Sequence, residues 1–254
     1  MGGDCIQMPR FFINSEDIFD DNIIIKGDDY NHIKKVLRLK CGEIITLSDG
    51  VENEYNVRIE VFGDDFVHTK IVESHKNVTE PPVKVILYQG LPKSDKMDFI
   101  IQKSVELGVS KVVPVLTERT VVKIDSQKDA MKKWERWSRI SQEAAKQSNR
   151  GIIPEVELPV SFKEAIRRVN NESLSIIPYE KESKKSLKQI LRSNEQKKHI
   201  SVFIGPEGGF TEQEIEEAVS FGINSVTLGP RILRTETAGI AVLSILMYEV
   251  GDVG

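Results

Sequence analysis

Two glycine-rich turns near the carboxyl end of the chain have the residue types best suited to binding a ligand. Residues 205–210, the first elbow, read GPEGGF and follow the apolar run 200–204. Residues 229–239, the second elbow, read GPRILRTETAG and follow the run 225–228. Both runs are short and β-branched, which predicts buried strands, and each elbow leads into a helical pattern. In α/β domains ligands bind beyond the carboxyl ends of such strands.

The composition of the elbows narrows the kind of ligand. Neither contains the Gly-Lys-Ser/Thr sequence of a phosphate-binding P-loop, and no G-x-G-x-x-G follows a strand. Glu207 would repel a phosphate but tolerate a cation. Glycines also let the backbone approach a flat, neutral group such as an adenine. Two tight turns in an ordinary α/β domain remain the alternative.

These motifs resemble the closing signature of the RsmE-type 16S ribosomal RNA methyltransferases of the SPOUT superfamily. Four further segments resemble the same family: HIKKVLR at 32–38, the block from Leu91 to Val109, TERT at 117–120 and EAAKQSNR at 143–150. The resemblance implies a trefoil-knotted α/β methyltransferase domain with an N-terminal PUA-like β-barrel domain. It also implies methylation of N3 of a uridine in 16S ribosomal RNA, with S-adenosylmethionine as the cofactor.

The resemblance also implies site residues. Backbone groups around the two elbows and on the preceding strand are expected to bind the cofactor: Ile177, Pro178, Ile204, Gly205, Gly208, Gly209, Leu228, Gly229, Ile232, Leu233 and Ala238.

Methyl transfer from a sulfonium requires mainly positioning of the nucleophile, without a metal. Uridine N3 must lose its proton, and a nearby cation would stabilise the resulting anion. Arg234 is the first candidate for this catalytic role, Arg10 the second and Arg231 the third. Glu236 is a candidate base, although capping of the last helix is its simpler role.

Binding of RNA would depend on local basic patches, because the net charge of the chain is −4 and that of residues 1–76 is −6. The residues expected to contact phosphates are Lys34, Lys35, Arg38, Lys40, Lys93, Lys96 and Arg150. A solvated helix face is the alternative for the first four of these residues.

Hydrophobic periodicity predicts the elements that position these residues. Residues 1–76 are expected to form the RNA-binding PUA-like barrel, with Ile33, Val36 and Leu37 on one face of a helix at 28–39. Pro81-Pro82 indicates a linker, and residues 77–254 are expected to form the knotted α/β domain. Predicted strands cover 10–13, 23–25, 43–47, 55–61, 66–72, 83–88, 111–116, 174–178, 200–204 and 225–228. One predicted helix begins after Ser94 or Asp95, which is expected to cap it, and a long helix is predicted over 130–150. Further helices are predicted to start at 161 and 211 and to cover 240–250. Residues 180–198 are expected to form an exposed helix and loop.

Several classes of protein are disfavoured. No apolar run approaches the roughly 20 residues of a membrane helix, and the start of the chain does not resemble a signal peptide. Cys5 and Cys41 form no Cys-x-x-Cys pair and are expected to stay reduced in the cytoplasm. The four histidines lack metal-ligand spacing, so no metal is expected.

The family resemblance implies a homodimer acting on 16S ribosomal RNA or the small ribosomal subunit. Two alternatives remain open: methylation of another RNA such as transfer RNA, and a non-enzymatic RNA-binding dimer.

Overall fold

A computed structural model describes residues 8–169, 173–194 and 198–253. The chain divides into two compact units. Met1–Glu80 and Ala145–Ile153 form the N-terminal unit, and Pro81–Ala144 and Pro154–Gly254 form the C-terminal unit. Each unit has its own hydrophobic core and is described separately.

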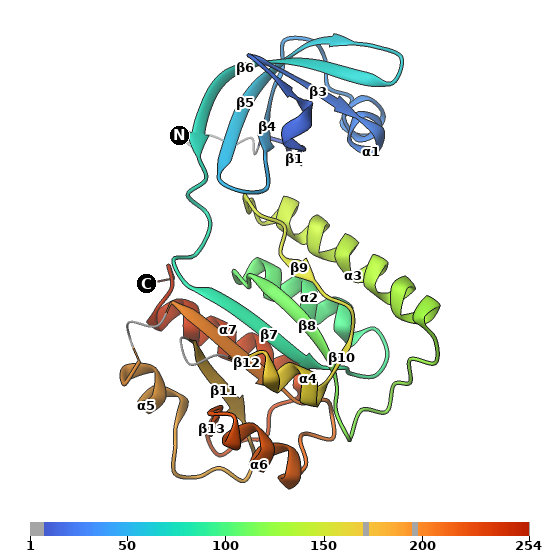
Figure 1. Cartoon of the computed structure of the whole chain (residues 1–254). Helices are drawn as coiled ribbons and strands as arrows, with labels where there is room; N and C mark the ends of the chain where they lie inside the picture. Colours follow the sequence, from blue (N-terminus) through green and yellow to red (C-terminus); the bar gives the residue numbers. More distant parts are fainter. Residues whose placement is uncertain (1–7, 170–172, 195–197, 254) are drawn as a thin grey trace. The chain divides into compact units, whose positions relative to one another are not determined.

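The N-terminal unit is built on a curved six-stranded sheet in the order β1-β4-β5-β6-β3-β2 (Figure 1). β1 pairs with β4 in parallel, and the other neighbours are antiparallel. Its inner face buries aliphatic side chains such as Ile23, Ile45 and Ile59. The five predicted strands are confirmed. The bounds are β1 (Arg10–Phe12), β2 (Ile18–Phe19), β3 (Asn22–Lys26), β4 (Ile44–Ser48), β5 (Asn53–Phe62) and β6 (Phe66–Lys76), with a 3-10 turn, η1, at Ser15–Asp17.

The helical segment of this unit differs from the prediction. It consists of a short α-helix, α1 (Gly27–Asn31), and a π-helix, η2 (His32–Val36). The N–H of Leu37 donates to the carbonyl of His32, five residues back, at 2.9 Å. Ile33 is buried, but Val36 and Leu37 are 66% and 37% exposed. The prediction of one apolar face was therefore wrong, because the wider π-turn changes which residues face the core.

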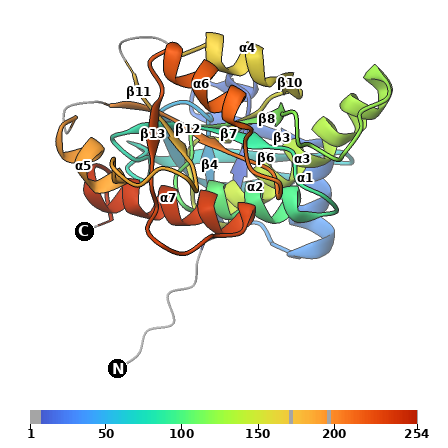
Figure 2. The same ribbon diagram turned by 90° about the horizontal axis from the view of Figure 1, so that it is seen from below.

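The C-terminal unit contains a parallel sheet in the order β10-β8-β7-β12-β11-β13, with β9 also pairing with β8. Figure 2 shows α4 and α6 on one side of this sheet and α2 and α7 on the other. This is the layered α/β arrangement that the sequence predicted. The strands are β7 (Lys84–Gly90), β8 (Lys111–Leu116), β9 (Glu155–Val156), β10 (Val160–Ser161), β11 (Leu174–Pro178), β12 (His199–Ile204) and β13 (Asn224–Val226).

Local capping signals fix several of the helices. The capping box predicted at Thr211 is confirmed, since its hydroxyl accepts from the N–H of Glu214 and the Glu214 carboxylate accepts from the N–H of Thr211. Asp95 occupies the N-cap position of α2, as predicted, but its side chain makes no cap hydrogen bond. Asp95 instead pairs with Arg136 at 3.2 Å. The helices are α2 (Lys96–Glu106), α3 (Gln127–Gln147), α4 (Phe162–Arg167), α5 (Leu187–Arg192), α6 (Glu212–Ser220) and α7 (Thr235–Glu249).

Smaller differences concern short elements. β9 and β10 were not predicted, because two residues show no periodicity. β13 ends at Val226, which leaves Leu228 in the loop of the second elbow. Within the charged segment expected to be exposed, α5 buries Leu187 and Leu191.

Candidate active site

The order of the strands brings the two elbows to one edge of the C-terminal sheet. β11 lies between β12 and β13, and all three run in the same direction. The first elbow follows β12 and the second follows β13. Ile177 and Pro178 close β11, where they pair with Ser225 and Val226 of β13. These two predicted cofactor residues therefore lie beside the strand that leads into the second elbow.

One buried hydroxyl joins the two elbows. Thr235, the first residue of α7, donates from Oγ1 to the carbonyl of Gly205 at 2.6 Å. The same oxygen accepts from Nε2 of Gln89 in β7 at 2.8 Å. Thr235 and Gln89 are both buried. The end of β7, the first elbow and the start of α7 are thus held together by side chains that the sequence analysis did not identify.

The first elbow requires its glycines for two different reasons. Gly209 has a φ of +66°, a conformation that side chains other than glycine rarely adopt. A Cβ on Gly205 would lie 3.1 Å from the backbone of Gly209. The N–H of Gly209 closes the turn by donating to the carbonyl of Pro206 at 2.9 Å. The elbow is therefore a compact backbone loop.

Charged side chains flank both elbows. The ammonium of Lys96 lies 3.0 Å from Glu207 Oε1 and 3.4 Å from Glu236 Oε2. Burial alone would raise the pKa of Glu207, but hydrogen bonds from Lys96 and from backbone N–H groups hold it below its ordinary value. Glu236 lies in the first turn of α7, where a carboxylate complements the helix dipole, but the N-cap of this helix has no side-chain hydrogen bond.

The second elbow presents its side chains to solvent. Arg231 and Arg234 are exposed, and Ile232 is 88% exposed. Among the described residues, no hydrogen-bond partner is found for the N–H groups of Leu228, Ile232 and Leu233. These donors remain available to a ligand.

The predicted cofactor residues differ in their exposure to solvent. Ile177 and Ile204 are buried in strands, and Gly208 and Gly229 are exposed in the elbows. Those that are partly exposed are Pro178, Gly205, Gly209, Leu228, Leu233 and Ala238.

A cavity of about 460 Å³ lies beside the first elbow. Arg119 closes one side by donating from Nη1 to the carbonyl of Gly208 at 2.7 Å. The TERT motif was the only sequence signal for this contact. The cavity is lined by Glu118, Arg119, Tyr179, Glu180, Lys181, Phe210, Thr211, Glu212 and Gln213, so its wall carries charges of both signs.

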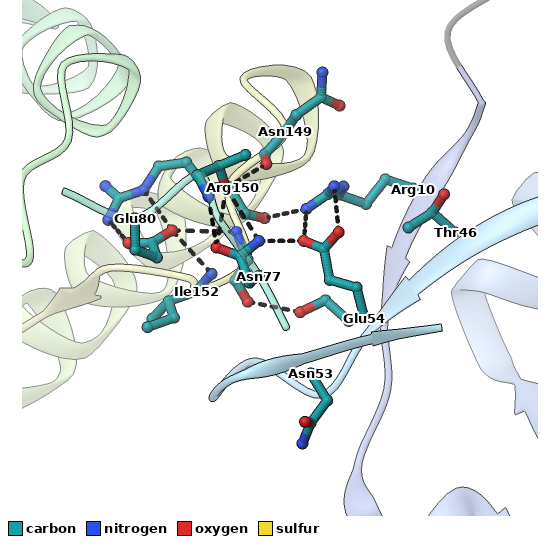
Figure 3. Close-up of polar contacts among 12 residues, drawn as sticks. Arg10, Thr46, Asn53, Glu54, Asn77, Glu80, Asn149, Arg150 and Ile152 are labelled. Carbon is teal, nitrogen blue, oxygen red and sulfur yellow. Dashed lines mark hydrogen bonds and ion pairs between the residues drawn. The ribbon is translucent and has the colours of Figure 1, made fainter. Parts of the chain in front are cut away.

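Two arginines predicted to serve the site have other partners within the N-terminal unit (Figure 3). Arg10 binds both carboxylate oxygens of Glu54, at 2.5 and 3.0 Å, and also donates to the carbonyl of Arg150. Arg150 has a side chain only 5% exposed and pairs with Glu80 at 2.5 Å. The backbone N–H groups of Gly151 and Ile152 also donate to Glu80. These contacts give both arginines a structural role.

Not every side chain of the predicted basic cluster at Lys34, Lys35, Arg38 and Lys40 is free to contact a phosphate. Lys34 donates to the hydroxyl of Tyr30 at 2.5 Å and lies over its ring. All four residues of this cluster, Lys34, Lys35, Arg38 and Lys40, are exposed. In the C-terminal unit Lys93 is also exposed.

Comparisons with known proteins agree with this architecture. A family model for an RNA methyltransferase domain matches residues 79–247, and a model for an RNA methyltransferase PUA domain matches residues 25–72. Ribosomal RNA small subunit methyltransferase E from Bacillus subtilis is 36% identical over 229 residues, covering 89% of each chain. Its counterpart from Mesomycoplasma hyopneumoniae is 34% identical over 238 residues, covering 93% of this chain and 98% of the relative.

The chain belongs to the ribosomal RNA small subunit methyltransferase E family.

Solved structures extend the match to the family's fold. The crystal structure of methyltransferase E from Neisseria gonorrhoeae bound to S-adenosyl methionine has a TM-score of 0.86 and 34% identity, covering 98% of this chain and 100% of that chain. A methyltransferase from Legionella pneumophila in complex with the same cofactor also has a TM-score of 0.86 and 34% identity, covering 97% and 100%. The predicted SPOUT-type fold with a PUA-like N-terminal domain and the predicted family are therefore confirmed.

The elbows of this methyltransferase fit an adenosyl cofactor. Free N–H donors at Leu228, Ile232 and Leu233 match the hydrogen-bond acceptors of an adenine, and the exposed Ile232 offers it an apolar surface. Within the described ranges, no group of three or more His, Cys, Asp and Glu side chains is placed to hold a metal ion. No described helix is long and apolar enough to cross a membrane.

Proposed function

We propose that this chain transfers a methyl group from S-adenosylmethionine to N3 of a uridine in 16S ribosomal RNA. The observation that supports it most is the joining of the two elbows by Thr235 and Gly205, in a chain that belongs to the methyltransferase E family. The cofactor, when bound, supplies a methyl group on a cationic sulfur. The role of the protein is to hold donor and acceptor in line.

We assign stabilisation of the uridine anion to Arg234. It is exposed at the N-cap of α7, and no partner for its guanidinium is found among the described residues. A cation at this position would favour loss of the N3 proton. Arg10 is less suited to this role, because its guanidinium is engaged by Glu54. Glu236 remains a candidate proton acceptor next to Arg234.

We propose that RNA phosphates are bound by exposed basic residues. Lys35, Arg38 and Lys40 in the N-terminal unit and Lys93 in the C-terminal unit meet this condition, and Lys34 is exposed as well, although its ammonium donates to the hydroxyl of Tyr30. Lys34 supports the π-turn through Tyr30, and Arg150 is neutralised by Glu80. Replacing the exposed residues should weaken RNA binding and reduce its salt dependence. The log–log slope should fall by about 0.7 for each phosphate of a single strand that the variant no longer binds.

We propose that the chain acts as a cytoplasmic homodimer. On α7, Ile245 and Tyr248 are 40% and 68% exposed, which leaves apolar surface for a second copy. Cys41 is an exposed free thiol, a state that a reducing compartment preserves. Sedimentation velocity should give twice the mass of one chain, and a single-chain mass at micromolar concentration would contradict the dimer.

The test of the function is mass spectrometry of ribosomal RNA from a strain lacking the gene. One methylated uridine should disappear from 16S ribosomal RNA and return with the intact gene. An unchanged 16S profile with a missing modification in transfer RNA would instead support the other RNA substrate. Equilibrium dialysis adds a second criterion, since a non-enzymatic RNA-binding protein should not bind S-adenosylmethionine at micromolar concentration.

A further inference from the structure

Lys96 contacts acidic residues from both elbows. It is the first residue of α2, and its ammonium lies 3.0 Å from Glu207 Oε1 in the first elbow. The same nitrogen lies 3.4 Å from Oε2 of Glu236 in the first turn of α7, within the second elbow. One cation therefore bridges two carboxylates that are 29 residues apart in sequence.

The segment before α2 strengthens the contact with the first elbow. The backbone N–H of Lys93 faces both carboxylate oxygens of Glu207, at 3.2 and 3.3 Å. The hydrogen bond to Glu207 raises the pKa of Lys96, and the pKa of Glu207 is lowered despite its burial. The pair is therefore fully charged at neutral pH.

The negative charge of the Glu236 carboxylate is balanced by Lys96. Its Oε2 is fully buried and has no hydrogen-bond partner among the described residues. The ammonium of Lys96, at ion-pair distance, is the cation that faces it. Without Lys96 no cation would lie between Glu207 and Glu236, whose carboxylates repel as like charges, and Glu207 would keep only its backbone hydrogen bonds.

We propose that Lys96 is a positioning residue of the cofactor pocket, which holds the first elbow against the start of α7. Lys96 was predicted to contact RNA phosphates, but its ammonium already pairs with two carboxylates. This inference rests on the proposed function, in which S-adenosylmethionine binds between the elbows. Lys96 touches neither substrate nor cofactor in this role and acts through Glu207 and Glu236.

Isothermal titration calorimetry with S-adenosylmethionine, without RNA, tests the proposal. Lys96→Met should weaken binding about tenfold, a change of about 1.4 kcal/mol, because the elbows separate. Lys96→Arg should restore most of the affinity, since a guanidinium can still bridge two carboxylates. Lys103→Met, on the same helix, is the matched control and should bind the cofactor like the wild type, because the ammonium of Lys103 pairs with Glu106 of that helix.

A double-mutant cycle separates a specific bridge from general destabilisation. Glu207→Gln should weaken cofactor binding. The loss of binding free energy in the double variant Glu207→Gln/Lys96→Met should be much smaller than the sum of the losses in the two single variants. Additive losses would overturn the bridge. Thermal denaturation shows whether Lys96→Met is folded. If it is not, the cofactor affinities of Glu207→Gln and Lys96→Arg still test the bridge.

The remaining outcomes distinguish the inference from the proposed function. Wild-type protein that binds no S-adenosylmethionine would contradict the proposed function itself. Wild-type affinity in Lys96→Met would overturn the inference alone. If that variant also has a weaker salt dependence of RNA binding, Lys96 is a phosphate contact after all.

Discussion

Gly90, at the end of β7, lies against Pro206 in the first elbow, so closely that a Cβ on Gly90 would be 2.6 Å from the ring nitrogen and Cδ of the proline. The carbonyl carbon of Gly205 would be 2.9 Å away. Because two of these three atoms belong to the backbone, rotation of a side chain cannot relieve the overlap. The end of β7 therefore sets the position of the first elbow.

Gly90→Ala should displace the first elbow. We expect S-adenosylmethionine affinity to fall about tenfold or more, and the free energy of unfolding to fall by about 1–3 kcal/mol, as for other overpacked sites. Calorimetric titration and urea unfolding measure these two quantities. Gly239→Ala is the stability control, since its Cβ would lie 3.6 Å from Gln89 Oε1, an ordinary contact. Equal stability of the two variants would contradict the close approach of Gly90 to Pro206.

Thr235→Val should destabilise the same region for a polar reason. Valine is close in shape, but it removes the hydroxyl that donates to the carbonyl of Gly205 and leaves Nε2 of Gln89 with one acceptor, the carbonyl of Gly90. Each unsatisfied buried group costs about 1–3 kcal/mol. Urea unfolding measures the loss, and Thr235→Ser, which keeps the hydroxyl, should lose much less. If both variants were equally stable, the hydrogen bonds would contribute little.

Arg234→Ala should lower turnover more than cofactor affinity. Its cation acts on the anion that forms as N3 loses its proton, so its effect belongs to the transition state. We expect a decrease in kcat on the order of 10²-fold, as for loss of one stabilising donor. Single-turnover methylation and calorimetry give the two quantities. A parallel loss in both would assign Arg234 to cofactor binding, and Arg231→Ala serves as the neighbouring comparison.

The stabilisation provided by Glu207 should depend on pH. Its folded-state pKa lies below the ordinary value of 4.5, so its contribution is present above pH 4.5 and is lost as pH falls through the lowered value. Lys96 does not titrate in this range, because its pKa is raised from 10.5. The difference in unfolding free energy between wild type and Glu207→Gln should be constant from about pH 5 to 8 and shrink in more acidic solution. A difference that persists at about pH 2 would show that the charge of Glu207 contributes nothing.

Glu80→Ala should strongly destabilise the N-terminal unit, because it leaves the buried guanidinium of Arg150 without its main carboxylate. Breaking one side of a buried pair costs about 3–5 kcal/mol. Arg150→Met removes the buried charge instead and leaves Glu80 bound to the N–H groups of Gly151 and Ile152, so its loss should be smaller. Differential scanning calorimetry compares the stabilities of the two variants. An Arg150→Met variant less stable than Glu80→Ala would contradict the importance of the pair.

The sequence was informative wherever structure is set by neighbouring residues. Glycine positions and the Thr211 capping box predicted the elbows and the start of α6 directly. Five strands of the parallel sheet, β7, β8, β11, β12 and β13, followed from short apolar runs, whereas the two-residue strands β9 and β10 did not. The π-turn at His32–Val36 was missed, because helical periodicity assumes 3.6 residues per turn.

The contacts that join distant segments were not predictable from spacing. Thr235 and Gln89 are 146 residues apart, and Lys96 and Glu207 are 111 residues apart. A basic residue on a predicted helix has the same sequence signal whether it meets a phosphate or a carboxylate. For the same reason Arg150 was expected to contact a phosphate, although it is buried against Glu80.

The assignment of Ala145–Ile153 to the N-terminal unit affects how that unit can be isolated. Its backbone supplies the carbonyl of Gly151 to Ser48 and that of Arg150 to Arg10, and Lys146 pairs with Asp29. A fragment that stops at the diproline would lose the contacts that this peptide makes with Asp29, Ser48 and Glu80. Excision or exchange of the PUA-like unit between relatives therefore requires a second piece of polypeptide, supplied in trans or spliced on by a short linker.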